Sequence, residues 1–220
     1  MSPVLRPLLL LLVAVAAVWV LRPAPQPAVG AGATAAFVAP TPASRTRSFT
    51  FAGVAPADQQ AVLQAVDAAR PEARRLIDAI AGLVTVRVGS AGPTSAGTTQ
   101  ATPAGYELVL DLGLVNRTLG RRGIDRLVLH ELGHVVEFAL VPEATLDALD
   151  KGVPRGYGCD DGRLGACAGR EERFAESFAK WASGDIGVDL SIGYKVLPPV
   201  MPLETWAEPL TRLALPAEAP

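Results

Sequence analysis

The sequence predicts a folded domain of the α+β class, in which helices and strands are mixed without a regular β-α-β alternation. Half of the 220 residues are hydrophobic, so the chain has enough apolar surface to form a core. Some segments carry apolar residues at the spacing of one helical face, and others alternate apolar and polar residues as half-buried strands do. No internal repeat is visible.

The elements can be assigned in chain order. Pro56 and Pro71 each open a helix, because proline is favoured at the first helical position. The segment LVTVRV at 83–88 alternates apolar and polar residues and is rich in β-branched side chains, which predicts a strand. The predicted strands are 49–51, 83–88 and 106–112, the predicted helices are 56–70, 71–80, 124–140, 142–149, 170–182 and 204–213, and the predicted loops are 90–105 and 152–169.

The N-terminal part of the chain predicts an export signal. Residues 1–21 contain one basic residue, Arg6, followed by an unbroken apolar run at 7–21. This pattern is typical of a secretory signal peptide, and an uncleaved signal anchor that tethers the protein to the membrane is the alternative. Residues 22–47 are rich in proline and alanine and predict a linker, and residues 48–220 predict the functional domain. We therefore expect the protein to be secreted or anchored to the outer face of the cell membrane.

The charge balance excludes one class of partner. The chain has 20 basic and 22 acidic residues, which gives a net charge of −2. A nucleic-acid-binding domain needs a basic surface, so no nucleic-acid partner is expected.

The chemistry of the protein is indicated by the segment His130-Glu131-Leu132-Gly133-His134, which is an HExxH motif on a predicted helix. Positions i and i+4 lie on one helical face, so both imidazoles can reach one cation. Glu131 lies at the rim of that face, where it can accept a proton from a water molecule that the metal activates. The chain contains only two histidines and both are in this motif, which makes a chance match improbable.

A catalytic zinc site needs a third protein ligand, and with no third histidine that ligand is a carboxylate or a cysteine. The best candidate lies on the predicted helix 170–182, where Glu172 and Glu176 are four residues apart and share a face with Ala175 and Ala179. Two like charges at this spacing repel each other unless a cation or a donor is near. A solvated acidic face is the alternative interpretation.

The pattern resembles the gluzincin metallopeptidases, and most closely their lethal-factor-like zinc peptidase domains. Residues 172–178 match the second-helix pattern E-x-F-A-E-x-F of those domains position by position. The resemblance covers the two motif helices, about 25 residues, and implies a zincin-like fold. It implies that zinc is bound by His130, His134 and Glu172, that Glu131 is the general base, and that Glu176 holds a ligand imidazole through its far N–H.

Two other ligands compete with Glu172. Glu171 is adjacent, but the residue four positions later is Ala175, so no acidic group would support it. Cys159 and Cys167 precede the helix in a glycine-rich loop. In an exported protein we expect these two cysteines to form a disulfide, with free thiols or a cysteine metal ligand as the alternatives.

The predicted site also needs a residue that stabilises the transition-state oxyanion. Related enzymes commonly use a tyrosine or a histidine, and no further histidine exists here. Tyr157, in the loop before the second helix, is the favoured candidate, and Tyr194 and Tyr106 are the others. A tyrosine in such a loop is equally compatible with ordinary surface structure.

Together these patterns predict an exported zinc-dependent endopeptidase that acts on a peptide or protein. We expect the substrate to pair with the edge of a strand, with residues 106–112 as the candidate. One alternative is a zincin-like domain that hydrolyses a non-peptide amide or serves only as a binding module at the cell surface. The other is a membrane-tethered interaction module without a metal.

Overall fold

The computed structural model describes residues 48–155, 168–187 and 195–214. All of these belong to one compact unit that spans residues 39–220. The predicted signal at 1–21, the linker at 22–47, Tyr157, Tyr194, Cys159 and Cys167 lie outside the described residues. None of the helices within the described ranges is long and apolar enough to cross a membrane.

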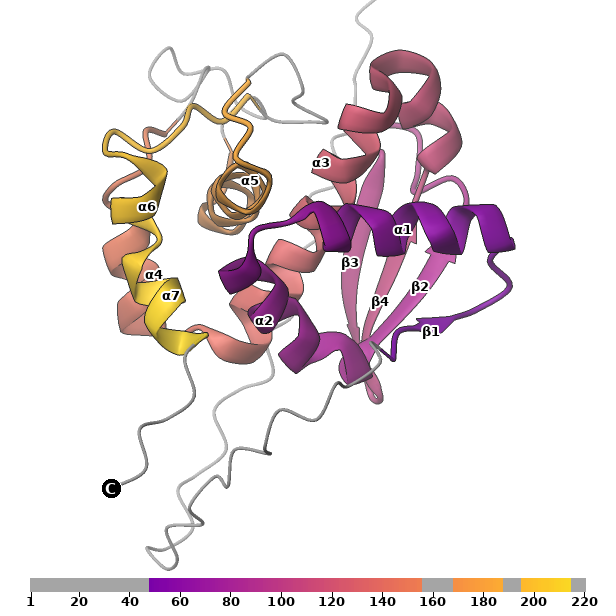
Figure 1. Ribbon diagram of the computed structural model, residues 1–220, viewed down its shortest axis with the longest axis horizontal. Coiled ribbons are helices and arrows are strands. Elements are labelled where there is room, and N and C mark those ends of the chain that lie inside the picture. The colour runs from indigo at the N-terminus through magenta and orange to yellow at the C-terminus, as the bar shows by residue number, and fades with distance from the viewer. Residues whose placement is uncertain (1–47, 156–167, 188–194, 215–220) are drawn as a thin grey trace, which may run out of the picture. The chain divides into compact units, whose positions relative to one another are not determined.

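A mixed four-stranded sheet forms one layer of the unit (Figure 1). Its strands are β1 (Thr50–Phe51), β2 (Val84–Val88), β3 (Gly97–Thr102) and β4 (Gly105–Leu110), in the order β1-β2-β4-β3. β1, β2 and β4 are parallel neighbours, whereas β3 runs antiparallel to β4 in a tight hairpin. With the helices described below, this sheet confirms the predicted α+β class.

The expectation of a loop over residues 90–105 is wrong, because β3 lies within it. The strand contains three threonines, which favour β structure, but no large apolar residue. β3 occupies the edge of the sheet and its residues are half-buried or exposed. A strand in this position is held by backbone pairing with β4 and needs little hydrophobic burial, so its hydrophobic pattern is weak.

The proposal that a substrate could pair with residues 106–112 is also wrong. β4 lies inside the sheet and pairs with β2 on one side and β3 on the other. Neither of its edges is open to a further strand. β3 ends the strand order, and within the described ranges its outer edge pairs with no strand.

The helices supply most of the core, and the sheet buries one face against it. Val86, Leu108 and Leu110 are buried on that face, whereas Arg87 and Glu107 form an ion pair on the other face at 2.7 Å. The helices are α1 (Pro56–Ala68), α2 (Pro71–Ile80), α3 (Leu112–Leu140), α4 (Glu143–Asp150), α5 (Arg170–Ser183), α6 (Leu203–Trp206) and α7 (Glu208–Leu213), with a 3₁₀ turn at Ala81–Leu83.

The helix that carries HExxH starts earlier than its apolar pattern predicts. The sequence predicts a helix from residue 124, but α3 begins at Leu112, where the Asp111 carboxylate accepts a hydrogen bond from the Leu114 N–H at 2.8 Å. Gly120 then adopts φ +64° and interrupts the helix. A non-glycine residue is disfavoured in that conformation. The break separates a short first segment from the longer segment that carries the motif.

The two motif helices pack closely because small residues lie between them. A Cβ atom added at Gly133 of α3 would lie 3.2 Å from Cα of Ala175 in α5. Phe174, Phe178 and Trp181 of α5 are buried in the core. The aromatic side chains therefore anchor α5, while Gly133 and Ala175 let its acidic face approach the motif helix.

Candidate metal centre

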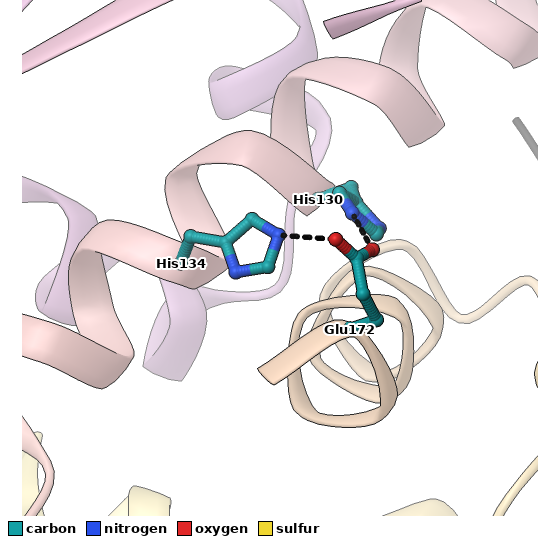
Figure 2. Close-up of side chains that lie close together, drawn as sticks. All are labelled: His130, His134 and Glu172. Atoms are coloured by element: carbon teal, nitrogen blue, oxygen red, sulfur yellow. Dashed lines mark ion pairs between the residues drawn. The ribbon is translucent and has the colours of Figure 1, made fainter. Parts of the chain in front are cut away.

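The contact between α3 and α5 brings two imidazoles and a carboxylate together. His130 Nε2 lies 3.2 Å from Glu172 Oε2, and His134 Nε2 lies 3.8 Å from Glu172 Oε1. Figure 2 shows the Glu172 carboxylate between the two rings, which project from successive turns of α3. One donor atom from each residue lies within 4.8 Å of the other two, so the group could hold a metal ion.

The donor set fits zinc. Four ligands at 2.0–2.1 Å in tetrahedral geometry are about 3.3 Å apart. The separation of Glu172 Oε2 from His130 Nε2, 3.2 Å, matches this value, and that of Glu172 Oε1 from His134 Nε2, 3.8 Å, is longer. Two imidazoles and one carboxylate also form a donor set typical of catalytic zinc, which leaves one coordination position free. The Glu172 side chain is 36% exposed, so solvent can reach the group from its α5 side.

The far nitrogen of His130 faces a buried charge network. His130 Nδ1 lies 3.3 Å from Glu176 Oε2. The other oxygen of Glu176 accepts hydrogen bonds from Arg126 at 2.9 Å and from Lys180 at 2.8 Å. Arg126, Glu176 and Lys180 are at most 3% exposed. The carboxylate is thus held at Oε1 by two cations, which leaves Oε2 directed at the imidazole.

Glu131 is held by the edge strand. The Thr99 hydroxyl of β3 lies 2.7 Å from Glu131 Oε2 and 3.1 Å from the backbone carbonyl oxygen of Glu131. A Cβ atom at Gly97 would collide with Glu131 Oε1, so the absence of a side chain at this position makes room for the carboxylate. β3 therefore determines where the Glu131 carboxylate lies.

The charges of the site act strongly on one another. Burial by itself would lower the pKa of His130, but the carboxylates of Glu172, Glu176 and Glu131 outweigh it and raise the pKa to about 10. Burial would raise the pKa of Glu172 and of Glu176, but His130 lowers both below the ordinary value, assisted at Glu176 by Lys180 and Arg126. Without a metal, the network is therefore arranged around a protonated His130.

This protonation predicts a pH dependence of metal affinity. A metal ligand must be neutral imidazole, so a metal ion has to displace the His130 proton below pH 10. The apparent affinity should rise with pH, by up to about tenfold per unit between pH 6.5 and 10. The stability of the metal-free protein should instead fall as the pH rises. His130 has a higher pKa in the folded than in the unfolded state, so its contribution to stability is complete below pH 6.5 and is lost as pH rises through 10.

The measurement is a chelator competition at pH 6.5, 7.5 and 8.5, with urea unfolding of the metal-free protein at the same pH values. A zinc affinity that does not change over this range would show that His130 is already neutral there.

The remaining predicted residues are not all brought to the site. Glu171 is outside the group of donors formed by the two histidines and Glu172. Tyr106 stacks on Phe138, which stacks on His134, with ring centroids 6.3 Å and 6.0 Å apart. Tyr106 is therefore separated from the metal-binding group by one aromatic ring.

Sequence patterns alone did not identify Thr99, Arg126, Glu137 or Lys180. A signal existed for three of them. Arg126 lies four residues before His130, Glu137 lies three residues after His134, and Lys180 lies four residues after Glu176, so each shares a helical face with its neighbour. Thr99 could not be identified, because its strand was not predicted.

Comparisons of the chain with protein-family models, with curated proteins and with solved structures find no match in any of the three.

Proposed function

We propose that the protein is a zincin-like, zinc-dependent endopeptidase. The observation that carries this proposal is the Glu172 carboxylate between the two imidazoles of an HExxH helix, with Glu131 on the same helix. The similarity of residues 172–178 to the second helix of lethal-factor-like peptidases supports it. We further propose that the enzyme acts outside the cell, exported or tethered through residues 7–21.

The residues divide into metal-binding and proton-transfer roles. His130, His134 and Glu172 would hold zinc, which when bound supplies a Lewis acid for the scissile carbonyl and for a water molecule. Glu131 accepts the proton of the attacking water and returns it to the leaving amine. The Thr99 hydroxyl donates to Glu131 Oε2, which holds the carboxylate in one orientation while the other oxygen exchanges the proton.

The edge strand offers a place for the substrate. β3 is held against β4 on one side, lies next to Glu131, and within the described residues pairs with no strand on its outer edge. An extended peptide can pair with such an edge through its main chain, which aligns the peptide without requiring a particular sequence. We propose that the substrate peptide lies along Gly97–Thr102.

The test measures the zinc content of the full-length chain after zinc has been added and the excess removed by dialysis. The wild-type protein is compared with variants of the adjacent residues Glu171 and Glu172 and with a variant of His130. We expect about one zinc per chain in the wild-type protein and in Glu171→Gln. The variants Glu172→Gln and His130→Ala should bind zinc much more weakly, because each removes one of three protein ligands. Hydrolysis of a quenched fluorescent peptide mixture should follow zinc content.

Three results would contradict the proposal. A folded wild-type protein without zinc would exclude the metal site. Equal loss of zinc in Glu171→Gln and Glu172→Gln would show that general acidity of α5, rather than the Glu172 ligand, controls binding. Zinc binding without hydrolysis of any peptide would favour the binding-module interpretation.

A further inference from the structure

Glu137 is a buried carboxylate on α3, one turn after His134, and the proposed mechanism does not use it. It is only 2% exposed. Its Oε2 atom lies 3.8 Å from His134 Nδ1, and both atoms are buried without a hydrogen-bond partner among the described residues. Buried polar atoms are nearly always paired, so two unpaired atoms that face each other need an explanation.

Among the described residues, no other group donates a hydrogen bond to Glu137 Oε2. The charges on α5 that act on Glu137 are those of Glu171, which is repulsive, and Arg170, which is attractive. Arg170 directs its guanidinium at Glu143 and Asp147 of α4, with hydrogen bonds of 2.7 Å and 3.0 Å. The imidazole N–H of His134 is therefore the one donor that the geometry offers to Glu137 Oε2 within the described ranges.

The arrangement repeats what is found at the other imidazole. His130 directs Nε2 at Glu172 and Nδ1 at Glu176, at 3.2 Å and 3.3 Å. His134 directs Nε2 at Glu172 and Nδ1 at Glu137, at 3.8 Å for both contacts. Each ring thus has one nitrogen toward the shared carboxylate and the other toward a buried carboxylate of its own. The two contacts of His130 are within hydrogen-bond distance, whereas the two contacts of His134, both at 3.8 Å, are too long for a hydrogen bond.

We propose that Glu137 is a positioning residue for the metal centre: its Oε2 accepts the Nδ1 proton of His134 when the ring binds zinc through Nε2. This inference rests on the zinc site proposed above. Zinc binding through Nε2 fixes the tautomer that carries its proton on Nδ1, and a small movement of the ring closes the gap to Glu137. In the metal-free protein Oε2 of this carboxylate is buried without a hydrogen-bond partner among the described residues, which is unfavourable.

The proposal predicts that replacing Glu137 weakens zinc binding but does not lower the stability of the metal-free protein. Glu137→Met removes the acceptor at similar volume and should weaken zinc binding by roughly 10–100-fold. Glu137→Gln keeps a neutral acceptor and should weaken zinc binding less. Both variants should unfold, without metal, at a urea midpoint equal to or above that of the wild-type protein, because each removes a buried carboxylate whose Oε2 atom is unpaired.

The experiment measures the zinc Kd by chelator competition and the urea midpoint of the metal-free form, for the full-length wild-type protein and for Glu137→Gln, Glu137→Met and the control Glu171→Gln. Glu171→Gln changes a charge near Glu137 without touching His134, so its zinc Kd should stay near that of the wild-type protein.

A zinc Kd for Glu137→Met within about twofold of the wild-type value would overturn the inference and leave the zinc site intact. A lowered urea midpoint in both metal-free variants would also overturn it, since Glu137 would then be a residue that the fold needs. Absence of zinc from the wild-type protein would overturn the proposed function, and the inference with it.

Discussion

Glu131→Gln is expected to bind zinc as the wild-type protein does and to lose hydrolysis by roughly 10²–10⁴-fold. Glu131 is outside the group formed by His130, His134 and Glu172, so its replacement leaves all three donors in place. The amide oxygen of glutamine can still accept the hydrogen bond from Thr99. The variant therefore keeps the shape of the site and removes only the group that accepts a proton.

The measurement compares kcat/KM on a cleaved peptide with zinc content for the same preparations. Thr99→Val provides a graded control, because it keeps Glu131 but removes the donor that orients it. We expect Thr99→Val to lose less activity than Glu131→Gln and to retain zinc. Full activity of Glu131→Gln would show that another group is the base, and zinc loss in this variant would show that Glu131 is a ligand.

Glu176→Met should lower the free energy of unfolding of the metal-free protein by about 3–5 kcal/mol, because it removes the carboxylate that Arg126 and Lys180 share. Arg126 keeps a longer ion pair with Asp185 at 3.7 Å, whereas Lys180 loses its carboxylate partner. Both cations direct a hydrogen bond at Glu176 Oε1, and both are at most 1% exposed. Lys180 keeps one other acceptor, the Val196 carbonyl at 2.8 Å, which does not neutralise its charge. Urea unfolding without zinc separates this loss from any effect on metal binding.

Two further variants show whether the buried charges cause this loss. Glu208→Gln removes one partner of an exposed ion pair with Arg212 and should change stability by less than about 1 kcal/mol. The double variant Glu176→Met/Lys180→Met removes an anion and a cation together and should be more stable than Glu176→Met alone. If the double variant is the less stable of the two, the cost of Glu176→Met comes from lost packing and not from unpaired charge.

The helices were predictable where their hydrophobic pattern is local. α1, α2 and α5 begin and end within two residues of their predicted positions. Their apolar residues repeat at helical spacing, and prolines open the first two. β3 and the first part of α3 were not predicted. β3 is held by pairing with β4, and the start of α3 depends on the Asp111 cap more than on a long apolar face.

Part of the metal site was likewise predictable from the sequence, and part depends on the tertiary structure. The sequence by itself determined that His130 and His134 share one face of a helix and that Glu131 lies beside them, because helical geometry acts within one turn. It also pointed to Glu172 and Glu176 through their spacing and the resemblance. Only the tertiary structure decided that Glu172, rather than Glu171, lies between the imidazoles, since this depends on the rotation of α5 against α3.

The surroundings of the site also depend on tertiary structure. Thr99 reaches Glu131 from a strand 32 residues away in sequence, and Arg126 reaches Glu176 across 50 residues. Glu137 is only three residues from His134, yet its burial depends on how other elements cover it. Local periodicity determines which residues share a face, but long-range packing determines which charges lose their water and must find a partner.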